Sequence, residues 1–203
     1  TAIDKKTGLP EGWRKGKLGD FITLNYGKAL KSQDRLSGNV PVYGSSGIVG
    51  KHSTYLVNGP GVIVGRKGNV GSVFWEEDNF YPIDTVYYVT SKANIYYIFF
   101  FLKGQVFVNN DSAVPGLNRN SAYLKEGILP DDKILNLFEE KMNPLFNMKR
   151  NLQIQNILLK EARDILLPRL MTGMIDVDKI KLNDEREFLS AAETELHYNR
   201  KNV

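Results

Sequence analysis

Side chains that can bind an anion gather in one glycine-rich part of the sequence, residues 27–70. Six lysines and arginines and a single acid fall in this range. Lys, Arg, Asn, Ser and Tyr side chains on loops can donate hydrogen bonds to phosphates and base edges of nucleic acids. A second polar, basic turn follows at residues 118–120. The candidate DNA contacts are Lys28, Lys31, Tyr43, Ser45, Ser46, Lys51, Arg66, Lys67, Asn69 and Arg119.

The charge distribution is compatible with this interpretation without proving it. The chain has a net charge of +4, and residues 1–130 hold 15 basic against 10 acidic residues. Residues 131–203 hold 12 basic against 13 acidic residues. A basic, loop-rich patch favours a polyanionic partner. Charge alone fits a solvated, lysine-rich surface equally well.

Catalytic and metal-binding residue sets are scarce. The chain has no cysteine and only two histidines, His52 and His197, in different regions. This excludes disulfides, cysteine-ligated zinc and thiol nucleophiles. We therefore expect no catalytic residues and no metal site.

Two short strings imitate catalytic motifs. Residues 143–146, Asn-Pro-Leu-Phe, are similar to the Asn-Pro-Pro-Tyr/Phe loop of amino-methyltransferases, but no cofactor-binding glycine motif precedes them. Residues 130–133, Pro-Asp-Asp-Lys, contain pieces of a nuclease signature, yet one tetrapeptide cannot supply two separated carboxylates. A helix cap explains the second string better.

The elements that position the candidate contacts can be predicted from residue patterns. Residues 62–64 and 72–75 read as two strands joined by the loop 65–71, which predicts a hairpin with Arg66 and Lys67 near its tip. Residues 85–90 predict a third strand, and apolar spacing predicts a helix over 94–104. Residues 18–24 fit a short strand or a short helix. Residues 27–50 have loop chemistry with short extended pieces at most.

The longest periodic segment is residues 143–173, within which a helix is expected over 143–167. Asn143 suits an N-cap, Pro144 suits the first turn, Pro168 predicts the end, and a shorter helix is expected over 134–142. Such a helix would be about 37 Å long. A heptad-like seam and a second apolar stripe indicate partners on two sides. An ordinary core helix is the alternative. The predicted assembly residues are Leu145, Met148, Leu152, Leu159 and Leu166.

These patterns predict a mixed α+β domain over residues 1–130, with a small twisted sheet and a loop-rich surface. A long, coiled-coil-like helical region over 131–175 follows, and residues 176–203 form a polar tail with a composition typical of partial disorder. No apolar run approaches the roughly 20 residues that span a bilayer. The polar start has no secretory signal, and its first residue is not Met, so we expect a trimmed, cytoplasmic chain without membrane contact.

Four strings in this order resemble the specificity subunit of type I restriction–modification systems. The first is Leu-Pro-Glu-Gly-Trp at 9–13 with Lys-Leu-Gly-Asp at 17–20, which resembles the start of a target recognition domain. The glycine-punctuated strings at 40–48 and 65–71 resemble its core, and 112–120 resembles its closing turn. Residues 166–177, Leu-Leu-Pro-Arg-Leu-Met-Thr-Gly-Met-Ile-Asp-Val, resemble the end of the spacer helix of that family.

The resemblance implies a DNA recognition subunit that is not itself an enzyme. Such subunits carry two recognition domains, each of which reads half of a split site in double-stranded DNA, held apart by two long helices. Adenine methyltransferase (modification) subunits dock on the helices, and restriction subunits join for cleavage. The resemblance implies no cofactor on this chain, with S-adenosylmethionine, ATP and Mg expected on the partner subunits.

This chain departs from the family pattern because it has one recognition domain and one spacer region. We expect a homodimer or pairing with a second half-subunit, and a symmetric dimer would read a palindromic split site. Two other hypotheses stay open. A standalone nuclease or methyltransferase would require a catalytic residue set that the sequence does not display. A helical scaffold would leave the basic loops without a role.

Overall fold

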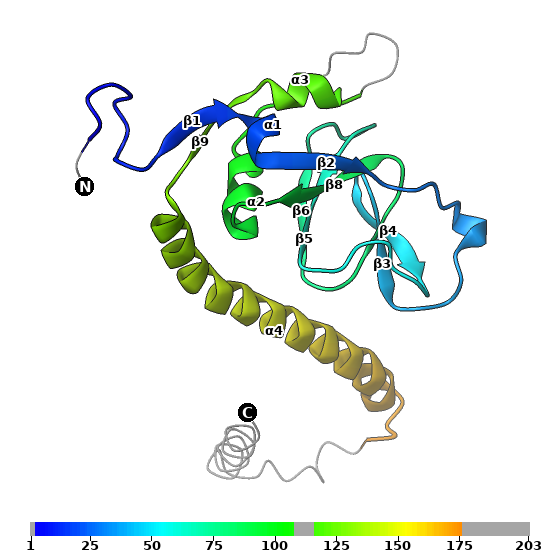
Figure 1. Cartoon of the computed structure of the whole chain (residues 1–203). Helices are drawn as coiled ribbons and strands as arrows, with labels where there is room; N and C mark the ends of the chain where they lie inside the picture. The colour runs from blue at the N-terminus through cyan, green and yellow to red at the C-terminus, as the bar shows by residue number, and fades with distance from the viewer. Residues whose placement is uncertain (1–2, 108–115, 176–203) are drawn as a thin grey trace, which may run out of the picture. The chain divides into compact units, whose positions relative to one another are not determined.

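The computed structural model describes residues 3–107 and 116–175 and contains nine strands and four α-helices within them (Figure 1). The chain divides into two compact units, Thr1–Arg150 and Asn151–Val203, which we describe separately. The elements are β1 (Arg14–Lys17), α1 (Leu18–Phe21), β2 (Ile22–Tyr26), the short 3-10 helix η1 (Ser32–Asp34), β3 (Val40–Gly44), β4 (Gly47–His52), β5 (Gly61–Gly65), β6 (Val73–Glu76), β7 (Tyr81–Pro82), β8 (Val86–Ser91), α2 (Ile95–Lys103), α3 (Arg119–Tyr123), β9 (Glu126–Leu129) and α4 (Asp132–Met171).

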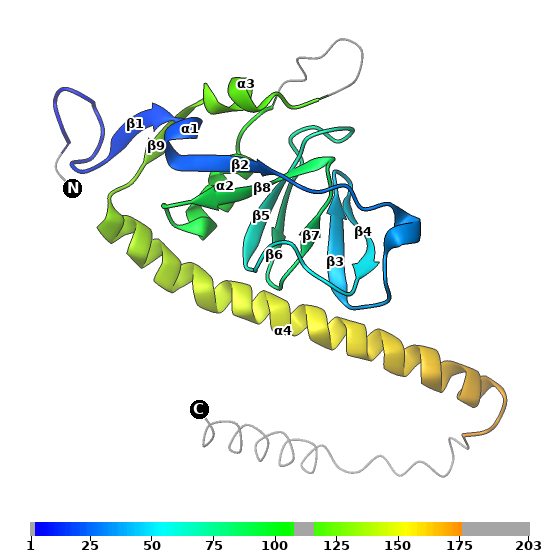
Figure 2. The same ribbon diagram turned by 45° about the vertical axis from the view of Figure 1, so that its right-hand side comes forward.

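The main sheet has four strands in the order β2-β8-β5-β6, and all its neighbours are antiparallel (Figure 2). The predicted hairpin is confirmed as β5 and β6, in which Val62 lies opposite Trp75. The predicted third strand is β8, which lies between β2 and β5. β5 is buried along its whole length, as expected for a central strand that carries three consecutive β-branched residues.

A second, three-stranded sheet has the order β4-β3-β7. β3 and β4 form an antiparallel hairpin, with a register shift between Val42 and Tyr43. The prediction of loop with short extended pieces was therefore too weak for residues 40–52. Glycine and polar residues hid the strand pattern, although Gly47, with φ of 101°, is the kind of residue that such a tight turn needs. The β3–β4 pairing depends on contacts that local propensity does not encode.

A two-stranded ribbon, β1 with β9, brings the beginning and the end of the domain together. Lys17 lies opposite Glu126 in this ribbon. The segment 18–24 contains both of the predicted alternatives, because α1 runs directly into β2. The Tyr123 hydroxyl of α3 accepts the backbone amide of Leu24 in β2 at 2.8 Å. This bond fixes α3 beside β2.

The main core lies between the four-stranded sheet and α2. The predicted helix over 94–104 is confirmed, and the Asn94 side chain caps it by accepting the Tyr97 amide at 3.0 Å. Trp75 stacks on Tyr96 with ring centroids 4.9 Å apart, and Phe146 of α4 meets Trp75 edge-on at 4.6 Å. Phe146 therefore belongs to the domain core rather than to an external helix face.

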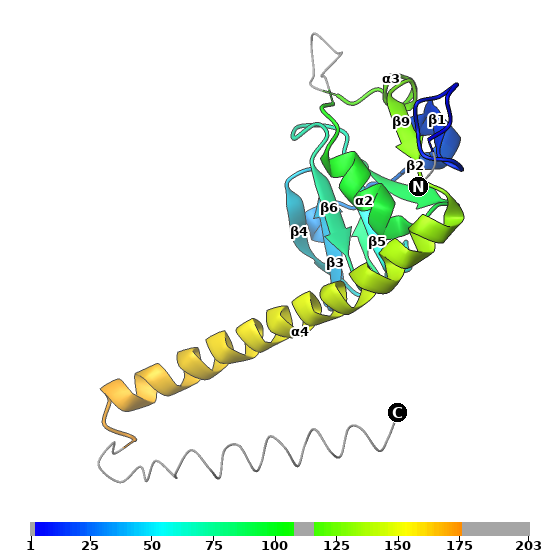
Figure 3. The same ribbon diagram turned by 90° about the vertical axis from the view of Figure 1, so that its left-hand side faces the viewer.

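The long helix differs from the prediction at both ends. α4 is one helix of 40 residues, about 60 Å long, rather than a short helix followed by a long one (Figure 3). Asp131 caps it, as expected, by accepting the Ile134 amide at 2.8 Å. The helix continues through Pro144, because a proline removes one hydrogen bond while the neighbouring turns remain bonded and Phe146 is buried. Pro168 likewise lies inside the helix, which ends at Met171 before Gly173, with φ of 70°.

Candidate nucleic-acid interface

Two turns that are separated in sequence lie in contact and form a double turn, residues 45–46 with residues 68–72. The Ser72 hydroxyl donates to the Ser45 carbonyl oxygen at 2.8 Å, and the Asn69 side-chain amide donates to the Ser46 hydroxyl at 3.4 Å. Ser72 also donates to the Asn69 carbonyl at 2.9 Å. Three candidate contacts, Ser45, Ser46 and Asn69, are thus brought together.

Glycines make this close approach possible. A Cβ on Gly65 would lie 2.1 Å from the Asn69 carbonyl oxygen and 2.3 Å from the Ser72 hydroxyl. Gly68 has φ of 79°, a left-handed conformation that side-chain-bearing residues rarely adopt, and its added Cβ would approach the Ser45 hydroxyl at 3.1 Å. The glycine spacing therefore serves the folding of the loop against its neighbour.

Arg66 leaves the end of β5 and is held in place by the backbone. Its guanidinium donates twice to the Asp84 carbonyl oxygen, from Nε at 2.9 Å and from Nη2 at 2.6 Å. The guanidinium carbon lies 5.3 Å from the centre of the Tyr26 ring and 5.9 Å from that of Tyr87. The neighbouring Lys67 is exposed, and its backbone amide donates to Thr85.

Arg119 joins this group from the other end of the domain. It begins α3, whose N-cap Asn118 accepts the amides of Asn120 and Ser121 at 2.9 and 3.3 Å. Its guanidinium carbon lies 5.2 Å from the Tyr26 ring centre. Arg66 and Arg119 therefore converge on one tyrosine.

Tyr26 is a site residue that the sequence did not single out as a contact. It ends β2, is 51% exposed, and packs against Tyr87 with ring centroids 5.1 Å apart. Burial and the adjacent Tyr26 raise the pKa of Tyr87 to about 12, although the two arginines act in the opposite direction. The available signal was an aromatic residue directly before Gly27 and Lys28 in the basic segment.

Three candidate lysines lie outside these clusters. Lys28 follows β2 and donates its backbone amide to the Pro82 carbonyl at 3.1 Å. Lys31 precedes η1, and Lys51 pairs with Pro41 in the β3–β4 hairpin. All three side chains are exposed, and none forms an ion pair within residues 3–107 and 116–175.

Tyr43 is placed differently from the other candidates. Its side chain is only 5% exposed and packs with Ile63, Phe80 and Val86 in a second core cluster. Its hydroxyl donates to a Glu76 carboxylate oxygen at 2.8 Å. Burial, and then the charge of Glu76, raises the pKa of Tyr43. Tyr43 thus has little surface for a ligand and anchors β3 in this second core cluster.

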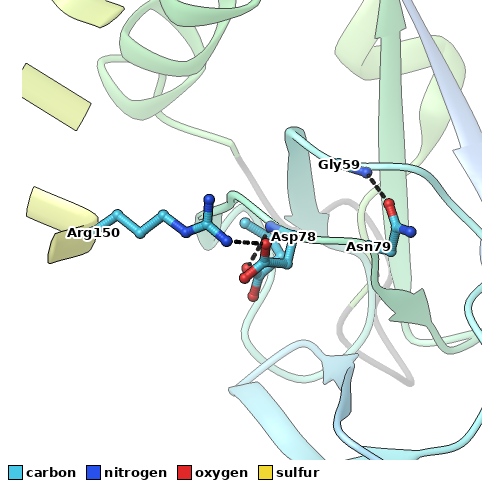
Figure 4. Close-up of polar contacts among 5 residues, drawn as sticks. Gly59, Asp78, Asn79 and Arg150 are labelled. Atoms are coloured by element: carbon cyan, nitrogen blue, oxygen red, sulfur yellow. Dashed lines mark hydrogen bonds and ion pairs between the residues drawn. The ribbon is translucent and has the colours of Figure 1, made fainter. Parts of the chain in front are cut away.

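The predicted assembly residues of α4 are all exposed in the single chain: Leu145, Met148, Leu152, Leu159 and Leu166. Around them, Ile154, Ile157, Leu158 and Ile165 are exposed too. Within the same helix, Arg150 ties α4 to the β6–β7 loop through an ion pair with Asp78 at 2.5 Å (Figure 4). In the same loop, the Asn79 side chain accepts the Gly59 amide at 3.0 Å.

Two further features, a membrane-spanning helix and a metal-binding cluster, were sought in the described part of the chain. No helix there is both long and apolar enough to cross a membrane. Within the same residues, no three His, Asp or Glu side chains come together in a way that could hold a metal ion.

The sequence of this chain matches a known protein family. Residues 10–120, more than half of the chain, match the type I restriction modification DNA specificity domain family. The chain is a member of this family.

A relative that the chain resembles in sequence supports this family assignment. The specificity subunit of the type I restriction enzyme MjaIX from Methanocaldococcus jannaschii is 24% identical over 206 residues, which cover 88% of this chain and 47% of that protein. The chain therefore spans about half the length of this relative.

Two solved structures share the fold. The type I restriction–modification S subunit from M. genitalium superposes with a TM-score of 0.66 at 13% identity, over 79% of this chain and 46% of that one. A chain from a study of complex assembly and conformational transition in the type I R-M system gives a TM-score of 0.50 at 14% identity, over 81% of this chain and 47% of that one. The predicted α+β domain followed by a long helix is thus confirmed.

Proposed function

We propose that this chain is the DNA sequence-recognition subunit, or half-subunit, of a type I restriction–modification complex, and that it reads half of a bipartite site. The observation that carries the proposal is the contact between the β3–β4 turn and the β5–β6 loop. It gathers Ser45, Ser46 and Asn69 beside Arg66 and Lys67 on one loop-built surface. Hydroxyl and amide groups suit base edges, while the cations suit phosphates.

Selection from a pool of randomised DNA duplexes tests this proposal. The chain, co-purified with the methyltransferase subunit of its system, should enrich one half-site motif, or two copies separated by a constant spacing. Asn69→Ala, on the exposed side of the double turn, should change or relax the motif, because each good base contact contributes about 1–3 kcal/mol of discrimination. Lys133→Ala, on the first turn of α4, should leave the motif unchanged and is the matched control. Enrichment of no motif would refute sequence recognition.

We further infer that the apolar seam of α4 is the assembly surface, with the recognition domain ending near residue 130 and the spacer covering 131–175. The adenine methyltransferase subunit docks there, the restriction subunit joins the assembled complex, and a second copy or half-subunit supplies the missing helix. Exposed apolar side chains at heptad-like spacing on α4 support a coiled-coil partner. A homodimer would read two identical half-sites in opposite orientations.

We propose no catalytic role for this chain. S-adenosylmethionine, ATP and Mg belong in this proposal to the partner subunits. Incubation of the purified chain with DNA, Mg²⁺ and S-adenosylmethionine tests this directly. Strand cleavage or methyl transfer by the chain alone, abolished by a substitution within it, would replace the proposal with a standalone enzyme.

A further inference from the structure

Two cations and one ring form a small group that we call the Arg–Tyr notch: Tyr26, Arg66 and Arg119. Both guanidinium carbons lie within 5.3 Å of the Tyr26 ring centre, so they are at most about 10.5 Å apart. Even this upper limit is comparable to the Debye length of about 8 Å at physiological ionic strength. The two positive charges therefore repel each other, and an anion bound between them would reduce this repulsion.

No carboxylate of the described residues forms an ion pair with either arginine. The ion pairs within 3–107 and 116–175 involve Arg150 with Asp78 and Arg163 with Asp164, and neither notch arginine takes part. Arg66 uses Nε and Nη2 on a backbone carbonyl, which carries no net charge, and its Nη1 edge makes no hydrogen bond there. Among the described residues, the notch therefore brings together two arginines, neither of which forms an ion pair, on a partly exposed surface.

The notch is also held in position from three elements. Tyr26 is fixed at the end of β2 by its contact with Tyr87, and the Tyr87 hydroxyl donates to the Leu117 carbonyl at 3.0 Å. The Leu117 amide in turn donates to the Arg66 carbonyl at 2.7 Å. Arg66 and Arg119 are therefore linked through the backbone as well as through the ring. Such preorganisation reduces the entropy lost when a ligand binds.

We propose that the Arg–Tyr notch binds one phosphodiester of the DNA backbone, with Arg66 and Arg119 on the same phosphate and Tyr26 as the positioning residue that both guanidinium groups contact. This inference rests on the proposed DNA-recognition function and assigns different parts of it to two groups of residues. The notch sets the register of the duplex on the domain, while the adjoining double turn meets base edges. Guanidinium groups suit this role because they bind phosphate oxygens through paired N–H donors.

The salt dependence of DNA binding tests the notch. The slope of log affinity against log salt changes by about 0.9 for each phosphate that a protein neutralises on duplex DNA. The double variant Arg66→Gln/Arg119→Gln should therefore flatten the slope by about 0.9, and by the same amount on the selected site and on an unrelated duplex. A loss of about 1.8 would mean two separate phosphates, and an unchanged slope would mean none. Either result overturns the shared notch.

Matched variants separate this inference from a folding defect and from the proposed function. Arg119→Gln alone should leave the fold intact, because the Arg119 guanidinium makes no hydrogen bond among the described residues. Tyr26→Phe should keep the wild-type slope, and Tyr26→Leu should resemble the arginine variants. Lys133→Gln, exposed on α4, should leave the slope unchanged. Circular dichroism and a thermal melt report the fold of each variant.

The remaining outcomes are equally decisive. Loss of affinity by Arg66→Gln on the selected site only, with an unchanged slope, would make Arg66 a base reader and overturn the notch while leaving DNA recognition intact. Inorganic phosphate that binds the wild type but not the double variant, with equal DNA slopes, would assign the notch to a free anion. Absence of any salt-dependent DNA binding by the wild type, with its methyltransferase present, would refute the proposed function instead.

Discussion

The two parts of α4, before and after residue 150, differ in what their apolar side chains do. Those of the first part include a buried core residue, whereas those of the second part are exposed. Phe146 is 6% exposed and packs against Trp75 and Tyr96, so the first part of the helix completes a domain core. Leu159 is 67% exposed, and every residue from 151 to 174 is exposed in the single chain. Apolar content therefore does not tell which residues a chain buries by itself. The first part of α4 completes a domain core, and the assembly surface that we propose lies on the exposed part of the same helix.

A charged substitution in the exposed part of α4 should have the largest effect of all, and it should affect assembly alone. Leu159→Asp places a charge in the centre of the seam, where a paired helix would bury it without a counter-ion. We expect loss of the dimer and of methyltransferase capture, with the thermal melt of the domain unchanged. Analytical ultracentrifugation and co-purification with the methyltransferase measure both.

The control for this substitution is Gln153→Asp, which adds the same charge to the same helix away from the seam. It should assemble like the wild type. A Leu159→Asp chain that still dimerises and still retains the methyltransferase would show that the seam is not the interface.

Breaking the buried part should affect stability instead. Phe146→Ala removes an aromatic side chain from the core and should lower the free energy of unfolding by about 3–5 kcal/mol. The neighbouring Leu145, 54% exposed, provides the matched control, since Leu145→Ala should cost less than about 0.5 kcal/mol in the single chain. Urea denaturation followed by tryptophan fluorescence measures both. Equal costs would contradict the division of the helix.

Alkaline pH should destabilise the domain before residue 151 selectively, because burial favours the protonated form of its tyrosines. The pKa of Tyr87 is raised from 10.0 to about 12 in the folded protein, mainly by burial. Its stabilising contribution is therefore fully present below pH 10 and is lost as the pH rises toward 12. Denaturation curves at pH 9 to 12 should show this decline. Residues 151–175 contain no tyrosine to add to it.

The matched variant for the pH experiment is Tyr87→Phe. At pH 8 it should be less stable than the wild type by about 1 kcal/mol, because the hydrogen bond to the Leu117 carbonyl is lost. Between pH 10 and 12 its stability should fall less steeply. An unchanged pH dependence would show that other groups control the alkaline transition.

The ion pair at the boundary between the two parts should matter least for stability. Arg150 and Asp78 are 47% and 62% exposed, so water screens their attraction. A double-mutant cycle of Arg150→Ala and Asp78→Ala should give a coupling of about 0.2–1 kcal/mol. A coupling near zero would leave Phe146 as the sole measured anchor of α4. A coupling above about 2 kcal/mol would contradict the screened geometry.

Local patterns were sufficient for elements whose residues carry a strong periodic signal. The β5–β6 hairpin, β8 and α2 were all predictable, because Val62, Ile63 and Val64 favour a strand and the spacing of Ile95, Ile98, Phe99 and Leu102 favours a helix. The β3–β4 hairpin was missed as a structural unit, because its stability comes from Tyr43 packing against Phe80 rather than from propensity. The breaks expected at Pro144 and Pro168 were wrong, since long-range packing and intact neighbouring turns outweigh one missing hydrogen bond.

Within the candidate interface, the sequence by itself determined which residue types are available: a basic segment, glycine-punctuated turns and a polar turn at Arg119. Only the tertiary structure decided which of them meet. It placed Arg66 and Arg119 on Tyr26, set Ser46 beside Asn69, and buried Tyr43 in a core. The physical reason is that residue type sets charge and hydrogen-bonding capacity locally, whereas proximity and burial depend on strand pairing between segments distant in the chain.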